Sequence, residues 1–333
     1  MAYSTGDLIL DNEYNIFATG NAAGSGDNSV ANTNTLWGTG TGDYGYGESS
    51  TISAVAAAGV ISATHWETLV GRMETIAAHQ GSSVTAVSTI SAGDQIAALA
   101  NFQTDINTIF ANRLNAAASG TPITSGGASA RTATWAGQTG TQTITTTQRV
   151  AFASAAAARY WFNAGGLITI TMSRSGGTTS DKNTEWANLT GDMGTVTLSG
   201  SDSHTVNGVA YTGTTQTGGA AGGSGSAKGT LDYHALTTSN QQLIKKYSDG
   251  SPYTANYIKV SALANGANLD ITTEMVDDAA DTANAAFPTT GNQQALDQVD
   301  GTITVTITAV PPSSTQLTSA SWGTPALSTT EAL

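Results

Sequence analysis

One stretch of the sequence decides the predicted fold: Arg159-Tyr160-Trp161-Phe162-Asn163-Ala164-Gly165-Gly166-Leu167-Ile168. The alanine-rich run before it predicts a helix over about 147–160, and the alternation over 167–173 predicts a strand directly after it. Gly165 and Gly166 can adopt backbone angles that are closed to other residues, and the aromatic side chains can anchor the turn against a sheet. The stretch therefore predicts a helix that leads straight into a β-sheet.

Downstream of this turn, short strands alternate with turn residues. Asn207-Gly208, flanked by apolar residues, is a strong signal for a two-residue β-hairpin. Frequent turns favour a sandwich or jelly-roll-like packing of antiparallel strands over 147–310, with one inserted helix. Further strands are expected at Val196–Leu198, 257–260, 269–275 and 302–307.

Upstream, residues 1–116 predict a helical domain. Three helices are expected, near 11–18, from Ser62 or Thr64 to Gly81, and over 92–114, because apolar residues recur there at helical spacing. A strand is expected between the last two, over 84–90. The fold class is therefore α+β: an N-terminal helical domain followed by an antiparallel β-sandwich-like domain.

Two segments show no clear periodicity. Residues 117–146, rich in Gly, Ser and Thr, predict a linker or surface loop. Pro311-Pro312 should end the last strand, so residues 311–333 predict an extended arm that is either disordered or laid on a neighbouring subunit. Trp322 is the expected anchor of that arm.

The surface chemistry favours assembly with other protein chains. Charged residues are only 11% of the 333 residues, against about 25% in a typical soluble domain. Small uncharged side chains carry little charge to desolvate at an interface. A low-charge style of solubility, as in extracellular and marine proteins, is the alternative explanation.

The net charge of −13 argues against nucleic acid and anionic membranes as partners, because phosphates need a basic footprint. Lys245-Lys246 is the only adjacent basic pair. With no cysteine, disulfides, thiolate metal sites and cysteine nucleophiles are excluded. Residues 1–7 lack the pattern of a signal peptide, and the most apolar window, 54–63, is about half the length of a membrane span.

A second motif joins the turn described above: a glycine–aromatic loop, Trp37-Gly38-Thr39-Gly40-Thr41-Gly42-Asp43-Tyr44-Gly45-Tyr46-Gly47. Together, this loop and the helix–Phe-Asn-Ala-Gly-Gly–strand unit resemble virion structural proteins of large contractile-tailed phages of marine bacteria, cyanophages especially. The resemblance covers roughly 1–115 and 147–310 and fails over 212–229. It implies membership of a virion (tail, baseplate, neck or fibre) and implies no reaction and no cofactor.

Several patterns match chemical motifs only in part. Gly40-x-Gly42-x-x-Gly45 fits the dinucleotide fingerprint by letter, but no strand precedes it, so a surface loop is the preferred interpretation. Asp202/His204 and Asp232/His234 could each offer two metal ligands, yet lack a third, so solvated hairpin residues are preferred. Asp277, Asp278 and Asp281 could bind a hard cation but lack EF-hand spacing, so an acidic surface loop is preferred.

We therefore expect a non-enzymatic, homo-oligomeric virion subunit, made in the host cytoplasm, that binds itself and other virion proteins. The alternative is a receptor- or carbohydrate-binding module displayed on a virion or cell surface; a host receptor is therefore possible. No metal or cofactor is expected. For the N-terminal aromatics, including Tyr3 and Tyr14, interface anchoring and the domain's own core remain equally open. The expected interface or structural residues are Trp37, Tyr44, Tyr46, Trp161, Phe162, Gly165, Gly166 and Trp322.

Overall fold

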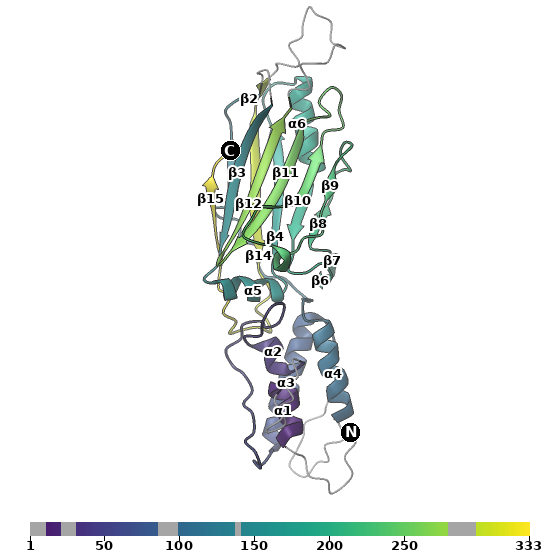
Figure 1. The fold of residues 1–333 in the computed structure, drawn as a ribbon, viewed down its shortest axis with the longest axis vertical. Coiled ribbons are helices and arrows are strands. Elements are labelled where there is room, and N and C mark those ends of the chain that lie inside the picture. Colours follow the sequence, from purple (N-terminus) through teal and green to yellow (C-terminus); the bar gives the residue numbers. More distant parts are fainter. Residues whose placement is uncertain (1–10, 21–30, 86–98, 137–140, 279–297) are drawn as a thin grey trace, which may run out of the picture.

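The computed structural model describes residues 11–20, 31–85, 99–136, 141–278 and 298–333. The molecule is elongated, with helices at one end and strands at the other (Figure 1). The fold is α+β, as the sequence predicts. One continuous hydrophobic core runs through both regions, from Tyr14 in the helical part to Trp322 near the C-terminus.

In the described part of the N-terminal region the helices are α1 (Asp11–Thr19), α2 (Thr33–Trp37), α3 (Ala63–Gln80) and α4 (Leu99–Ala111). The predicted apolar stripe of α3 is buried, and Trp66 stacks on Phe102 of α4 with ring centroids 5.2 Å apart. Helix α3 begins after Ser62, whose backbone N–H donates to Nδ1 of His65 (3.0 Å). Gly81 ends it in the left-handed conformation.

Two antiparallel sheets face each other in the C-terminal region (Figure 1). The first has the order β1 (Ala128–Arg131), β14 (Thr302–Val310), β4 (Leu167–Ser175), β5 (Thr195–Leu198), β8 (Thr214–Thr217). The second has the order β15 (Ala326–Glu331), β3 (Gln142–Ala151), β12 (Asn268–Asp277), β11 (Tyr257–Asn265), β10 (Gln241–Tyr247), β9 (Ala227–Lys228).

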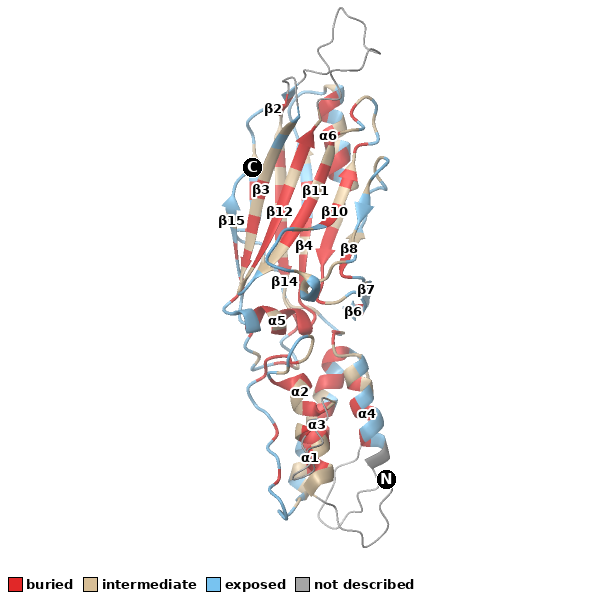
Figure 2. Cartoon of the chain, viewed as in Figure 1, coloured by how far each residue is buried: buried red, intermediate tan, exposed pale blue. Residues whose placement is uncertain are grey.

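Alternation along β3 and β14 buries one face of these strands (Figure 2). In β14 the inward residues are Ile303, Val305, Ile307 and Ala309, all at most 2% exposed. The outer strands of the two sheets also meet at both sides: Lys228 Nζ of β9 donates to the Thr214 carbonyl of β8 (2.8 Å), and β15 contacts β1. The two sheets are therefore in contact along both sides of the sandwich.

Smaller elements complete the β region: β2 (Trp135–Ala136) with β13 (Gln298–Val299), the hairpin β6 (His204–Val206) with β7 (Val209–Tyr211), α5 (Ala155–Asn163), α6 (Asp181–Asp192) and the 3-10 turn η1 (Tyr233–Ala235). Asn207 and Gly208 both have positive φ, so the predicted hairpin is confirmed. Helix α5 crosses the end of the sandwich that faces the helical region (Figure 1).

Two expectations about these elements need correction. The predicted helix over 147–160 is wrong in its first part, because β3 continues to Ala151 and α5 begins only after Ser154, which caps it. The β-branched threonines 143 and 145–147 favour the strand, and Ser154 can accept from Ala157 N–H (3.0 Å). The predicted loop 117–146 contains β1, β2 and half of β3, and α6 was not predicted.

The C-terminal segment also differs from the expected arm. Instead of being disordered or laid on a neighbour, it folds back on its own chain, and β15 pairs with β3 from Ala326↔Ala151 onward. Leu317 and Trp322 are 1% and 7% exposed. The apolar residues of this segment recur without a period, so the sequence does not predict a strand there. Several expectations lie outside the described residues: Tyr3, the strand over 86–90, the first part of helix 92–114, and Asp281.

Candidate functional site

The two motifs that carry the resemblance lie against each other and form the junction between the helical and strand regions. Asn163, fully buried at the end of α5, donates from Nδ2 to the carbonyl oxygens of Tyr44 (2.9 Å) and Gly45 (3.1 Å) in the glycine–aromatic loop. The Arg159 guanidinium donates to the Tyr44 carbonyl from one turn earlier. One face of α5 therefore binds backbone carbonyls of the loop.

Two histidines extend this junction. Nε2 of His234, within η1, lies 2.8 Å from Oδ1 of Asn163, and because the Asn163 amide nitrogen is already donating, the histidine is the donor. His79, near the end of α3, places Nε2 3.2 Å from the Ala164 carbonyl and is 1% exposed. Burial lowers the pKa of His79 to about 4, although the Ala164 carbonyl opposes this. His79 is therefore neutral at pH 7.

The two glycines after α5 are needed for different reasons. Gly165 has φ +88°, and a Cβ there would also overlap the side chain of Ala116. Gly166 has no positive φ; a Cβ there would instead overlap the indole of Trp161. The expectation of unusual backbone angles holds for Gly165 and is wrong for Gly166, which is required by close packing.

The chain crosses between the two regions beside the β6–β7 hairpin. Ala116 N–H donates to the Thr205 carbonyl (2.9 Å), and Asn207 N–H donates back to the Ala116 carbonyl (2.8 Å). Ala116, Leu167 and Val206 then form a small apolar cluster of their own. The hairpin thus fixes the connecting segment to the sandwich.

The C-terminal segment closes the junction from outside. Ser321 N–H donates to the Gly47 carbonyl (3.0 Å), and Ser319 N–H donates to the carboxylate of Glu48, which is 1% exposed. A Cβ at Gly47 would overlap the ring of Tyr160. Residues far apart in the sequence therefore converge on the last residues of the glycine–aromatic loop.

The aromatic residues expected at an interface or in a structural role are mostly buried within this chain. Trp161 and Phe162 have no exposed surface, and Trp322 is 7% exposed. Trp37 packs beneath Arg72, with the guanidinium 3.8 Å from its ring centroid. Tyr44 is half-buried beside Phe110, and Tyr46, 1% exposed, donates its hydroxyl to the Arg113 carbonyl (2.8 Å).

The partial chemical motifs also take part in the folded scaffold. The loop around Gly42 presents carbonyl oxygens to Asn163 and Arg159, the reverse of a phosphate site, which presents N–H groups. Asp43 pairs with Arg113. Asp277, 3% exposed, pairs with Lys182, fully buried, at 2.8 Å.

The two Asp–His pairs do not converge on a metal site. Asp232 caps η1 by accepting from Ala235 N–H (2.9 Å). His204 is 7% exposed, and burial lowers its pKa to about 4. The Ser201 backbone and the charge of Asp202 act in the opposite direction and raise the pKa. Within the described ranges, no group of three or more His, Asp or Glu side chains is placed to hold a metal ion.

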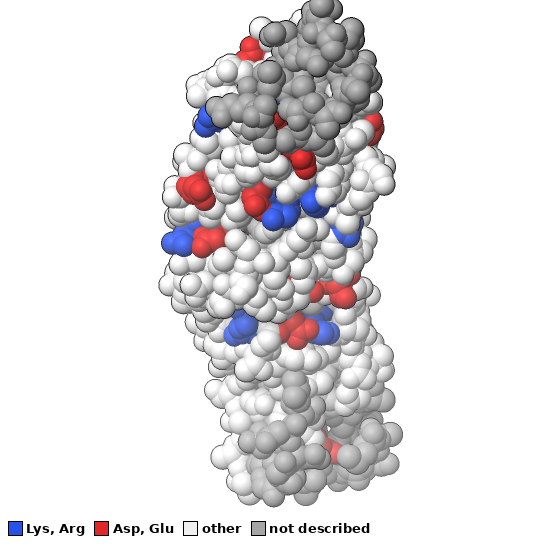
Figure 3. Space-filling model, turned by 45° about the horizontal axis from the view of Figure 1, so that its top comes forward, with Lys and Arg blue, Asp and Glu red and all other residues white. Residues whose placement is uncertain are grey.

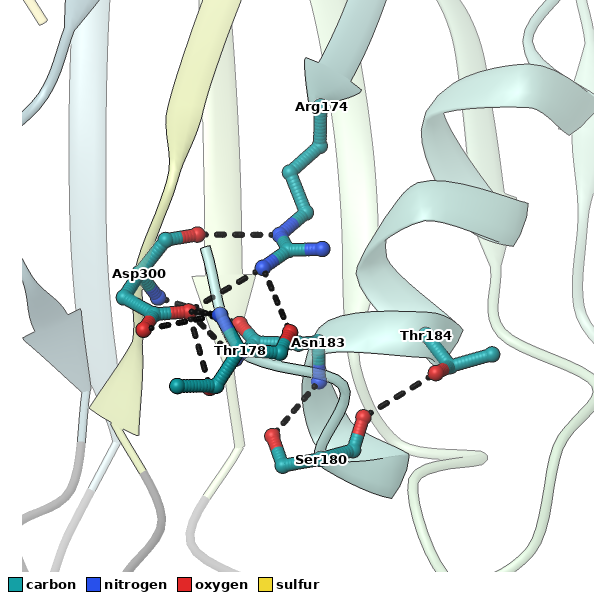
Figure 4. Close-up of polar contacts among 6 residues, drawn as sticks. All are labelled: Arg174, Thr178, Ser180, Asn183, Thr184 and Asp300. Atoms are coloured by element: carbon teal, nitrogen blue, oxygen red, sulfur yellow. Dashed lines mark hydrogen bonds and ion pairs between the residues drawn. The ribbon is translucent and has the colours of Figure 1, made fainter. Parts of the chain in front are cut away.

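Figure 4 shows a second polar cluster, formed by residues of β4, α6 and the segment before β14. Asp300 accepts from Thr178 N–H (3.0 Å) and from Arg174 (3.1 Å), and its own N–H donates to Oδ1 of Asn183 (3.0 Å). Desolvation opposes the change, but these donors and the Arg174 charge lower the pKa of Asp300. The cluster ties β4 to α6, so its role is structural.

Two clefts open beside the junction. One, of about 290 Å³, is lined by Asp43 and Leu114 on the helical side and by Asp232 and His234 on the other. The second, of about 390 Å³, lies between the end of α4 and the β6–β7 hairpin. Such volumes are near the lower end for ligand pockets, about 300–1,000 Å³.

Sequence reasoning missed the residue at the centre of the junction, Asn163. A single buried amide that contacts backbone carbonyls has no spacing pattern; its only signal was its place inside the Phe-Asn-Ala-Gly-Gly unit.

Comparison with known proteins gives no match: no protein-family model matches the chain, nor does any curated protein or solved structure. None of the described helices has the length and apolarity that crossing a membrane requires.

Proposed function

We propose that this chain is a non-enzymatic structural subunit of a phage particle, which assembles with copies of itself and with other virion proteins in a tail, baseplate, neck or fibre. The observation that carries the proposal is the contact between the two resemblance motifs, centred on Asn163 and the carbonyls of Tyr44 and Gly45. The polar groups of these motifs hold the two regions together through buried hydrogen bonds. A fixed junction of this kind suits a rigid structural subunit.

The surface supports the same proposal. Charged side chains are sparse on the face shown in Figure 3, and most of that face is uncharged. Among the described residues, the exposed large hydrophobic side chains are Val60 and Val209. Contacts with other subunits would therefore rest on small polar side chains, which carry little charge to desolvate.

Mass spectrometry of purified phage particles from cells that carry this gene tests the proposal. Peptides of this chain should be present in amounts comparable to those of known structural proteins, and should remain after the particles are washed in high salt. Their presence in the infected-cell lysate alone, with none in washed particles, would contradict virion membership.

A further inference from the structure

The larger cleft has walls from both halves of the molecule. The amides of Asn112 and Asn115 line it from the end of the helical region, and Asp202, His204 and Tyr211 line it from the β6–β7 side. Its volume of about 390 Å³ falls within the range of small-ligand sites. The junction described above holds these two walls at a fixed separation.

The two amides are positioned by a chain of hydrogen bonds. Thr205 N–H donates to Oδ1 of Asn115 (2.8 Å), and Nδ2 of Asn115 donates to Oδ1 of Asn112 (2.9 Å). Nδ2 of Asn112 then donates to the Thr108 carbonyl (3.0 Å). Each amide nitrogen uses one of its two protons in this chain, so a second donor remains on each.

The opposite wall offers a supported aromatic ring. Tyr211 stacks on the buried ring of His204, with centroids 5.8 Å apart and planes inclined by 26°. The His204 ring is itself 7% exposed, so Tyr211 rests on a buried side chain. Asp202 is exposed and also lines the cleft.

The lining chemistry selects a class of ligand. Among the described residues, the cleft has no Lys or Arg to bind a phosphate and no large aliphatic side chain to bind a lipid. It combines amides, hydroxyls, a carboxylate and one aromatic ring, which suit a neutral ligand rich in hydroxyl groups. We propose that this cleft binds a neutral oligosaccharide, with Asn112, Asn115 and Asp202 bonding its hydroxyl groups and Tyr211 packing against a sugar ring.

Saturation-transfer NMR and calorimetry on the full chain test this with four defined probes: maltohexaose, cellohexaose, mannohexaose and chitohexaose. At least one should bind, and Tyr211→Phe should keep the binding while Tyr211→Ala loses it. Because Tyr211 also packs against the cluster of Ala116 and Val206, loss of folding in Tyr211→Ala is checked by circular dichroism.

A matched pair of exposed aspartates keeps the result clear if Tyr211→Ala does not fold. Asp202→Ala should raise Kd at least about tenfold, equivalent to about 1.4 kcal/mol. Asp249→Ala, also exposed but outside the cleft, should leave Kd unchanged. The proposal is overturned if none of the four sugars binds, or if the two aspartate variants bind a sugar equally well. Either result is independent of whether the chain assembles into particles.

Discussion

At the scale of single residues, the junction depends on residues that contact groups far away in the sequence. Asn163 contacts three backbone carbonyls, His79 contacts one, and Gly166 lies directly against an indole. The Gly165-Gly166 pair could be predicted from the sequence as a turn. The reason for the second glycine could not, because it depends on where Trp161 is placed in space.

The packing against Trp161 predicts the effect of a single methyl group. Gly166→Ala should lower the free energy of unfolding by about 1–3 kcal/mol, because the added Cβ overlaps a ring that is fully buried. Gly71→Ala is the control: Gly71 lies within α3 with open space around it, so alanine should stabilise by about 0.5–1 kcal/mol. Urea denaturation measures both, and equal effects would contradict the packing account.

Buried His79 predicts a dependence of stability on pH. Its pKa is about 4 in the folded chain and 6.5 as the ordinary value, so between these the unfolded chain binds a proton that the folded chain does not. The free energy of unfolding should therefore fall as pH falls from about 6.5 to about 4, by up to about 3 kcal/mol from this residue.

Denaturant titrations at a series of pH values test this. His79→Gln should be less stable at pH 7 but should show a shallower loss of stability on acidification. If the variant and the natural chain lose stability in parallel, His79 does not titrate as its burial implies.

At the scale of elements, periodicity predicted the long, regular pieces and missed those defined by pairing. The stripe of α3 and the strands β12 and β14 were predicted from the sequence. Strand β15 was not, because only one of its residues, Leu327, is buried and the rest look like a polar tail. Whether a short polar segment forms a strand depends on an available partner, here β3.

The alternation in β15 gives a matched pair of substitutions. Leu327→Ala should lower the free energy of unfolding by about 2 kcal/mol, since the side chain is 8% exposed and belongs to the main core. Ser328→Ala, on the exposed side of the same strand, should change it by less than about 0.5 kcal/mol. Thermal and chemical unfolding measure both variants. If the segment were only an unpaired tail, the two substitutions would change stability equally.

Helix α6 is anchored by a buried ion pair. Breaking this pair should cost more stability than breaking a pair on the surface. Asp277→Asn removes the carboxylate that pairs with the buried Lys182 ammonium, and should cost about 3–5 kcal/mol. Glu274→Gln breaks the partly exposed pair with Lys259 on neighbouring strands, and should cost at most about 1 kcal/mol.

Replacing both partners, Lys182→Met with Asp277→Leu, should recover much of the loss caused by Asp277→Asn, because no isolated charge remains. Denaturant midpoints give the comparison. A double variant that is less stable than Asp277→Asn would show that the pair contributes more than the burial of two matched charges.

At the scale of the whole molecule, one core continues from the helices through the junction into the sandwich. The order of helical and strand regions was predicted from composition and periodicity. The continuity was not, since it arises where the C-terminal segment returns to Glu48 and Gly47, more than two hundred residues away in the sequence. A rigid, elongated and sparsely charged body is the form in which the proposed subunit would join its neighbours.

Self-association of the full chain is the most direct test of the structural role. Multi-angle light scattering at micromolar concentration, at near-physiological salt, should report a mass that is a defined multiple of 33.6 kDa, or a mixture that shifts toward it as concentration rises. A monodisperse species of 33.6 kDa at all concentrations, which also fails to join purified virion proteins, would contradict the account.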